Sequence, residues 1–196
     1  MKALVALVVL VLAVLGVVAW GVGVNNELVR QEQTVNEKWA QVQNVYQRRA
    51  DLIPNLVETV KGFAAQERGV LEAVTRARAS ASGVQLTPEM LNDPQALRRF
   101  QEAQGQLGSA LSRLLVTVER YPELKSNQNF LALQSQLEGT ENRIAVERMR
   151  FNEAVREYNT RLRQFPGSLV ASVRGFREKP YFEATPGSAA PPKVQF

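Results

Sequence analysis

Acidic, basic and amide side chains are the groups available for chemistry in this chain, because the sequence contains no cysteine and no histidine. Their absence excludes thiol nucleophiles, disulfides, zinc-finger sites and histidine general bases, and nearly all transition-metal sites. Glu138, Glu141 and Glu147 do not share a helical face as a set of metal ligands would. The sequence also lacks a glycine-rich phosphate loop and a serine nucleophile elbow. We therefore predict a protein that is not an enzyme, with no metal site and no cofactor.

Arg49 stands at a position where the pattern of the surrounding segment favours an apolar side chain. Glu141, Glu147 and Arg148 lie on or beside the apolar face of a later segment. We hypothesise a partly buried layer of ion pairs that joins these two segments and fixes their relative register. The alternative is that the same side chains extend out to water.

Further polar residues near these positions have both a functional and a structural interpretation. Arg48, Asp51 and Asn55 form either an exposed recognition surface or a structural set. Asn152 and Asn159, which are seven residues apart, either pair across helices or flank an apolar stripe.

Two heptad series predict the helix that positions Arg49. Offset by three or four residues, they form the apolar stripe of a coiled-coil-like helix. The series stay in phase across Pro54, so we predict one long helix over residues 25–82, bent at the proline and also countable as two helices. The series are Leu28, Val35, Val42, Arg49, Leu56, Phe63, Val70 and Ala77, and Trp39, Tyr46, Ile53, Val60, Glu67 and Val74.

Two more long helices are predicted, over residues 94–120 and 127–165. Asp93 and Pro94 form an N-cap and N1 pair at the start of the first one. Pro122 ends it, because proline disfavours helical conformation in the residue before it. One face of the other helix repeats every seven residues, at Phe130, Leu137, Ile144, Phe151, Tyr158 and Phe165. Burial of three long stripes predicts an all-α fold, an elongated antiparallel bundle over residues 25–175.

The C-terminal part of the chain follows the dipeptide Pro166-Gly167, which is expected to stop the preceding helix. A short amphipathic helix is predicted over residues 168–175, either against the end of the bundle or against lipid. Residues 176–196 are predicted to be extended or disordered. Val194 and Phe196 have the spacing of a C-terminal ligand motif for a β-augmentation groove, and a tail without such a role is the alternative.

An apolar run from Ala3 to Val24 predicts a transmembrane anchor over residues 1–24. As a helix it spans roughly 33 Å, enough for the hydrocarbon core of a bilayer. A cleaved signal peptide is the competing interpretation, but no convincing cleavage site precedes Trp20. No glycine or proline occurs between Val24 and Pro54, so anchor and bundle are expected to form one rod. Basic residues flank the span on both sides, which leaves the sidedness of the bundle open.

The charge pattern bears on possible partners. The net charge is +5, but the 24 Lys and Arg residues are mixed with 19 Asp and Glu residues along the predicted helices. Mixed charges are typical of solvated helix faces, so we expect no nucleic acid partner. The expected partners are the lipid bilayer and other membrane or envelope proteins, and a second copy of the chain is a further candidate.

Three spaced motifs carry a resemblance to a known family. The first is Arg48-Arg49-Ala50-Asp51-Leu52-Ile53-Pro54-Asn55-Leu56-Val57. The second is Tyr121-Pro122-Glu123-Leu124-Lys125, followed by Asn129-Phe130-x-x-Leu133-Gln134. The third combines Thr140-Glu141-Asn142-Arg143-Ile144 with Phe151-Asn152-x-x-Val155-x-x-Tyr158-Asn159. With these motifs, Phe165-Pro166 and Pro192-x-Val194-x-Phe196, the chain resembles the bacterial LemA family over essentially its whole length.

This resemblance implies a membrane-anchored bundle of four helices whose biochemical role is poorly defined. We expect a single-pass protein of the bacterial inner membrane that acts as a scaffold or interaction module. The alternatives are a regulator of an envelope protease or enzyme, engaged through the C-terminal tail, and a membrane-remodelling protein.

Overall fold

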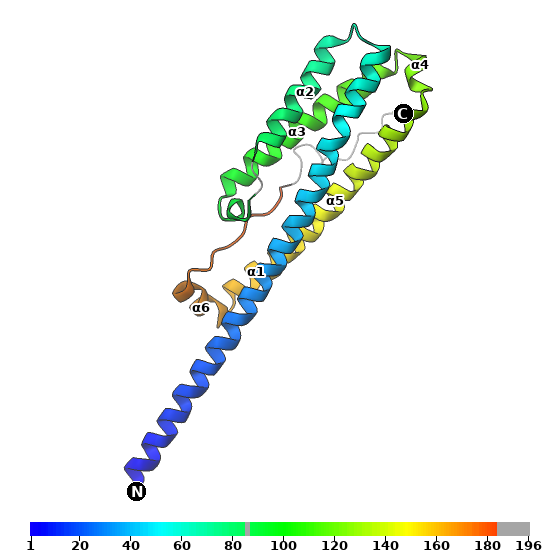
Figure 1. Cartoon of the computed structure of the whole chain (residues 1–196). Coiled ribbons are helices and arrows are strands. Elements are labelled where there is room, and N and C mark those ends of the chain that lie inside the picture. The colour runs from blue at the N-terminus through cyan, green and yellow to red at the C-terminus, as the bar shows by residue number, and fades with distance from the viewer. Residues whose placement is uncertain (85–86, 184–196) are drawn as a thin grey trace, which may run out of the picture.

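The computed structural model describes residues 1–84 and 87–183, and within these ranges the chain forms helices and no strand. The predicted all-α fold is therefore confirmed. Figure 1 shows one helix that begins at the isolated N-terminus and continues along the length of the bundle. The elements are α1 (Lys2–Phe63), α2 (Arg68–Gly83), the 3-10 helix η1 (Pro88–Asn92), α3 (Pro94–Val118), α4 (Pro122–Lys125), α5 (Gln128–Arg163) and α6 (Gly167–Arg174).

Four of these helices build the bundle. α1 packs along α5, and α2 packs on both α1 and α3. The short helix α4 turns the chain from α3 into α5. At the start of α3 the side chain of Asp93 accepts a hydrogen bond from the backbone N–H of Gln95, as expected for an N-cap. The bundle therefore has the four helices that the family resemblance implies.

The first part of α1 projects beyond the bundle, and its apolar side chains are exposed from Leu4 to Val22. Burial begins at Val24 and Leu28, which pack against Ala171 of α6. α1 is long and apolar enough to cross a membrane, judged by length and composition. No break separates the apolar part from the packed part.

The predicted helix over 25–82 is wrong in one respect, because the chain reverses between α1 and α2 at residues 64–67. The helix continues through Pro54 but ends at Phe63, so it is divided at residues 64–67 and not at the proline. The heptad phase cannot reveal such a reversal, because α2 turns the same stripe back onto the bundle. Leu71 and Val74 of α2 are buried in one cluster with Leu107 and Leu111 of α3. A straight helix would leave the apolar side chains of both segments exposed to water.

Polar side chains hold this reversal against the corner between α3 and α4. Tyr121 donates a hydrogen bond from its hydroxyl to Glu67, with an Oη–Oε1 distance of 2.7 Å, and accepts one from Gln66. Arg120 forms a 3.2 Å ion pair with the same carboxylate. The hydrogen bond to Glu67 raises the pKa of Tyr121 above its ordinary value, because it favours the protonated hydroxyl.

The core consists of three apolar clusters arranged along α1. The distal cluster contains Ile53 and Leu56, the middle cluster contains Trp39 and Tyr46, and the proximal cluster contains Leu28. Rings of the middle cluster lie with centroids 4.9–6.4 Å apart, at distances typical of edge-to-face packing. These rings belong to Trp39, Tyr46, Phe100, Phe151 and Phe182.

The turn from α5 into α6 requires glycine at position 167. A Cβ atom added there would lie 2.1 Å from the backbone oxygen of Arg161. The predicted stop at Pro166-Gly167 thus has a steric cause. α6 ends at Gly175, whose φ of 78° lies in the left-handed region that glycine tolerates best.

Pro54 lies inside α1 without ending it, and the structure compensates for the hydrogen bond that it cannot donate. A proline has no N–H, so the carbonyl of Ala50 loses its usual helical partner. Arg78 of α2 donates from Nε to that carbonyl at 2.8 Å. The proline therefore creates an acceptor on α1 through which α2 is attached.

We predict that the contribution of Arg78 to stability depends on Pro54. Arg78→Ala is expected to lower the free energy of unfolding by about 1 kcal/mol, because the Ala50 carbonyl loses its donor. In a Pro54→Ala background residue 54 supplies an N–H to that carbonyl, so the same substitution is expected to cost less. Chemical denaturation of the four variants measures this coupling, and Arg76→Ala, at an exposed position of α2, is the control. Equal costs of Arg78→Ala in both backgrounds contradict the explanation.

Candidate functional site

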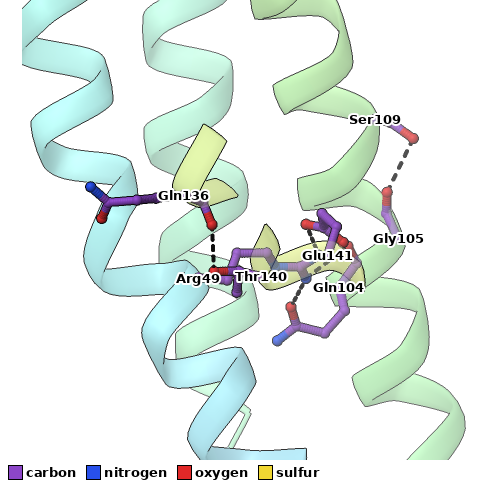
Figure 2. Close-up of polar contacts among 7 residues, drawn as sticks. All are labelled: Arg49, Gln104, Gly105, Ser109, Gln136, Thr140 and Glu141. Carbon is purple, nitrogen blue, oxygen red and sulfur yellow. Dashed lines mark hydrogen bonds and ion pairs between the residues drawn. The ribbon is translucent and has the colours of Figure 1, made fainter. Parts of the chain in front are cut away.

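A polar layer separates the distal and middle apolar clusters. Arg49 of α1 forms a 2.9 Å ion pair with Glu141 of α5, between Nη1 and Oε1. Its Nη2 donates to the side-chain and backbone oxygens of Gln104 on α3. Figure 2 shows the three side chains converging from three helices. The hypothesised pair of Arg49 and Glu141 is therefore present, and Gln104 is a partner that the sequence did not indicate.

The electrostatic environment of this layer is uneven. Arg49 is 4% exposed, whereas the side chain of Glu141 is 45% exposed. The guanidinium carbon of Arg49 also lies 5.1 Å from the ring centroid of Tyr46, where a cation is attracted by the aromatic face. Burial raises the pKa of the Tyr46 hydroxyl above its ordinary value. The layer is thus a buried cation whose carboxylate partner reaches water.

Two members of the hypothesised layer have other main partners. Glu147 forms a 2.9 Å ion pair with Arg150 on its own helix. Arg148 lies over the ring of Phe182, 4.8 Å from its centroid, and donates to the backbone oxygen of Glu183. Neither residue forms an ion pair with Arg49, although Arg148 lies in the same groove and interacts with Tyr46. Their separation from Glu141 by six and seven residues places them about two helical turns further along α5.

A groove of about 750 Å³ lies beside the polar layer, between α3 and α5. Tyr46 and Arg49 of α1 form part of its lining, and α5 contributes Glu141, Ile144 and Arg148. Half of the α3 residues in the lining are small and lie at helical spacing, namely Gly105, Gly108, Ser109 and Ser112, and the others are Arg98, Gln101, Glu102 and Gln104. We refer to this space as the α3–α5 groove.

The small residues of α3 leave room along the groove. A Cβ atom added to Gly105 or Gly108 would meet nothing within 4 Å. The hydroxyl of Ser109 donates to the carbonyl of Gly105, so it is turned along its own helix (Figure 2). Glycine inside a helix costs stability relative to alanine. Helix formation therefore does not explain why Gly105 and Gly108 stand on this wall of the groove.

An extended segment, residues 176–183, packs between α3 and α5 next to the groove. Asn159 accepts a hydrogen bond from the backbone N–H of Lys179 and donates to its carbonyl, at 3.0 and 2.9 Å. Asn152 makes the same two bonds to Phe182, at 2.9 and 3.0 Å. The two asparagines therefore hold the backbone of this segment, and the two expected alternatives, pairing across helices or merely flanking the stripe, are wrong.

Two side chains of this segment enter the bundle. Phe182 is 5% exposed within the middle cluster. Lys179 is 6% exposed and its Nζ contacts Glu32 of α1 at 2.8 Å and Asn92 at 2.7 Å. An extended or disordered tail was expected after residue 175, but this packing was not. The adjacent aromatic residues Tyr181 and Phe182 offered a signal, because large apolar residues next to each other in a solvated tail are unusual.

The remaining sequence candidates have different outcomes. Arg48, Asp51 and Asn55 are exposed on α1, and so is Pro54. Asp51 accepts a hydrogen bond from Gln47 at 2.7 Å, which belongs to the same helix. Recognition through this face stays a prediction. The proposed ligand motif at Val194 and Phe196 lies outside the described residues.

No set of three or more His, Cys, Asp or Glu side chains within residues 1–84 and 87–183 is placed to hold a metal ion. The groove instead offers hydrogen-bond donors and acceptors, one buried cation and a wall of small residues. These features can bind and orient another molecule.

The fold and this site define a membrane-associated, all-helical protein. A family model described as the LemA family matches residues 38–196, and the chain belongs to that family. It is 27% identical to "Magnetosome protein MamQ 2" of Paramagnetospirillum magneticum, over 94% of this chain and 74% of the relative. It is 27% identical to "Magnetosome protein MamQ" of Magnetospirillum gryphiswaldense, over 85% and 67% of the two chains. "Protein LemA" of Metamycoplasma hominis is 21% identical, over 84% and 71%.

The polar layer predicts coupled energetics for Arg49 and Glu141. Glu141→Ala leaves a buried cation without its carboxylate. The substitution is therefore expected to cost more stability in the wild type than in a protein that already carries Arg49→Ala. We expect the double variant to be less destabilised than the sum of the single variants by about 1 kcal/mol. Thermal or chemical unfolding of the four proteins measures this difference.

The exposed pair of Arg156 and Glu153 provides the control for that cycle. Its side chains are 67% and 59% exposed at a distance of 3.5 Å. Solvent screening is expected to reduce its coupling to about 0.5 kcal/mol or less. If the stability losses of Arg49→Ala and Glu141→Ala simply add in the double variant, the hypothesis that this layer fixes the register of the helices is wrong.

Asn152 and Asn159, each with two hydrogen bonds to the backbone of segment 176–183, form two asparagine clamps. We predict that loss of one clamp releases the segment without unfolding the bundle. Asn159→Ala removes both hydrogen bonds to Lys179 and is expected to cost about 1–2 kcal/mol. Hydrogen exchange at the amide of Lys179 is expected to accelerate, while the amides of α2 keep their protection. Asn142→Ala, at an exposed position of α5, is the control. Unchanged protection at Lys179 shows that the clamp does not hold the segment.

Proposed function

We propose that this chain is a non-catalytic scaffold, anchored in the bacterial inner membrane by a single pass of α1, that holds a segment of a partner protein in the α3–α5 groove. The observation that carries the proposal is the continuity of α1. One helix of 62 residues contains the apolar exposed part, Arg49 of the polar layer and the wall of the distal core. A protein that only needed to be tethered would tolerate a flexible linker at this point.

Continuity of α1 has a mechanical consequence. A helix rises 1.5 Å per residue, so Arg49 lies roughly 40 Å along the axis from Val22. Neither glycine nor proline lies between Val24 and Pro54 to allow a hinge. The groove is thereby held at a set height and a set rotation relative to the anchor. A rigid platform of this kind positions a bound partner, which is the role of a scaffold.

The groove also suits a protein segment in its chemistry. Its small-residue wall allows a backbone to approach closely, as glycine and serine do at helix–helix contacts. Gln104, Glu141 and Arg148 supply polar groups at the base and rim. Bound segments in protein grooves use apolar contact for affinity and a few polar groups for orientation.

The proposal predicts a position-dependent photocrosslink in native membranes. A photoreactive phenylalanine analogue in place of Ser112, which lines the groove, is expected to give a discrete product with a partner protein. The same analogue in place of Val116, which is 71% exposed on α3 outside the groove lining, is the positional control. Mass spectrometry of the product identifies the partner.

A second variant tests whether the groove itself is occupied. Gly108→Leu fills the groove and is expected to abolish the product from position 112, whereas Gly108→Ala is expected to keep it and to raise stability by about 0.5–1 kcal/mol. A product that is the same from positions 112 and 116, or a crosslink within the chain itself, contradicts the scaffold function of this groove.

A further inference from the structure

α6 is apolar on two faces, and the bundle covers one of them. Ala171 is 4% exposed and packs with Val24 and Leu28 of α1. On the other face Leu169 and Val173, one helical turn apart, are 57% and 82% exposed. A helix that is apolar on two faces is normally buried on both. Figure 1 places α6 beside α1, where the N-terminal part of α1 leaves the bundle.

The exposed face of α6 is continuous with the exposed apolar surface of α1. A groove of about 570 Å³ lies between the two helices, lined by Val17, Gly21, Leu169 and Val173 among others. Phe165, which is 71% exposed, precedes α6 and lies with its ring centroid 5.9 Å from that of Trp20. Apolar residues of both helices thus form one uninterrupted surface.

The length of α1 sets the depth of this groove in a bilayer. A hydrocarbon core of roughly 30 Å requires about 20 helical residues, which extend from Ala3 to Val22. Val17 to Val22 must therefore lie within the last turns of the span. Leu169 and Val173 share a groove with these residues, so they reach the same depth.

The polar end of α6 complements an anionic headgroup. Arg174 lines the rim of the groove and donates from Nε to the neutral Oδ1 of Asn25 at 3.1 Å. Two neighbouring cations are neutralised by carboxylates instead, since Arg163 pairs with Glu178 and Lys179 pairs with Glu32. Within residues 1–84 and 87–183 Arg174 forms no ion pair, so its charge is available to a phosphate. A basic residue next to an apolar helix face is the pattern of interfacial membrane helices.

We propose that α6 is a second membrane contact of this protein, in which phospholipid acyl chains cover Leu169 and Val173 and fill the groove against α1, while Arg174 binds the anionic headgroup. This inference rests on the proposed anchoring by α1. It assigns α6 the task of fixing the end of the bundle against the bilayer surface. The bundle is thereby attached at two points and cannot rotate about the axis of α1.

The absence of cysteine allows a direct test of depth in the full chain. Single variants Val173→Cys, Leu12→Cys and Val116→Cys carry a nitroxide spin label, in vesicles of phosphatidylcholine and phosphatidylglycerol at three to one. Collision rates with oxygen, which concentrates in lipid, and with a water-soluble nickel chelate are compared. Position 173 is expected to show an oxygen-to-nickel ratio several-fold above that of position 116, which is 71% exposed at the distal part of α3.

The three labels separate the two hypotheses. A lipid signature at position 12 with an aqueous signature at 173 overturns the role of α6 and keeps the anchor. An aqueous signature at position 12 overturns the anchor, and with it the argument about depth. Shielding of position 173 from both reagents shows that a second copy or another protein covers α6, which also overturns the proposal.

The headgroup contact has its own readout. Replacing phosphatidylcholine vesicles by the phosphatidylglycerol mixture is expected to raise the thermal midpoint of the wild type. Arg174→Gln is expected to lose most of this shift, Arg174→Lys to keep it, and Arg113→Gln, at an exposed position of α3, to behave as the wild type. An undiminished shift in Arg174→Gln overturns the assignment of Arg174 to the headgroup.

Discussion

The burial of Arg49 is the constraint on which the alignment of the bundle depends. Heptad stripes alone allow two helices to slide by seven residues with the same apolar contacts. A shift of α5 by one heptad would place Gln134 or Arg148 where Glu141 now lies, and neither is an anion. Loss of the carboxylate would leave a buried cation unpaired, which is far more costly than an exchange of one apolar side chain for another. We therefore propose that this ion pair selects a single register among several that the apolar pattern permits.

α1 also makes a second polar contact that orients a neighbouring helix, close to Pro54. The position of Pro54 in the helix exposes the carbonyl of Ala50, and Arg78 uses it to attach α2. α1 thus fixes α5 through Arg49 and α2 through the proline-freed carbonyl. α3 packs on α2, and its Gln104 accepts hydrogen bonds from Arg49. The positions of all helices of the bundle are therefore set relative to α1. This is why the continuity of α1 into the apolar N-terminal part matters for the orientation of the groove.

The sequence predicted those parts of the structure that repeat, and failed where distant segments decide. Heptads placed α3 and α5 within a few residues, and Asp93 marked the start of α3. The reversal at residues 64–67 escaped detection because α2 presents the same heptad phase after turning back. Arg49 and Glu141 were identifiable because charges on an apolar stripe need a partner. Gln104 and Arg78 were not, because nothing local shows that a buried cation will lie opposite Gln104 or a free backbone carbonyl opposite Arg78.

The asparagine clamps show what kind of segment the space between α3 and α5 accepts. Asn152 and Asn159 are seven residues apart on α5, which is about 10.5 Å along a helix. Lys179 and Phe182 are three residues apart in extended chain, which is about 10 Å. The two repeats match, so successive asparagines meet successive backbone groups of an antiparallel extended segment, each giving one donor and one acceptor. This segment reaches the α3–α5 groove at Glu183, whose backbone oxygen is bound by Gln101 and Arg148. The groove that this segment reaches is lined by other side chains with donors and acceptors, among them Gln104 and Glu141, and that favours a protein segment as its ligand.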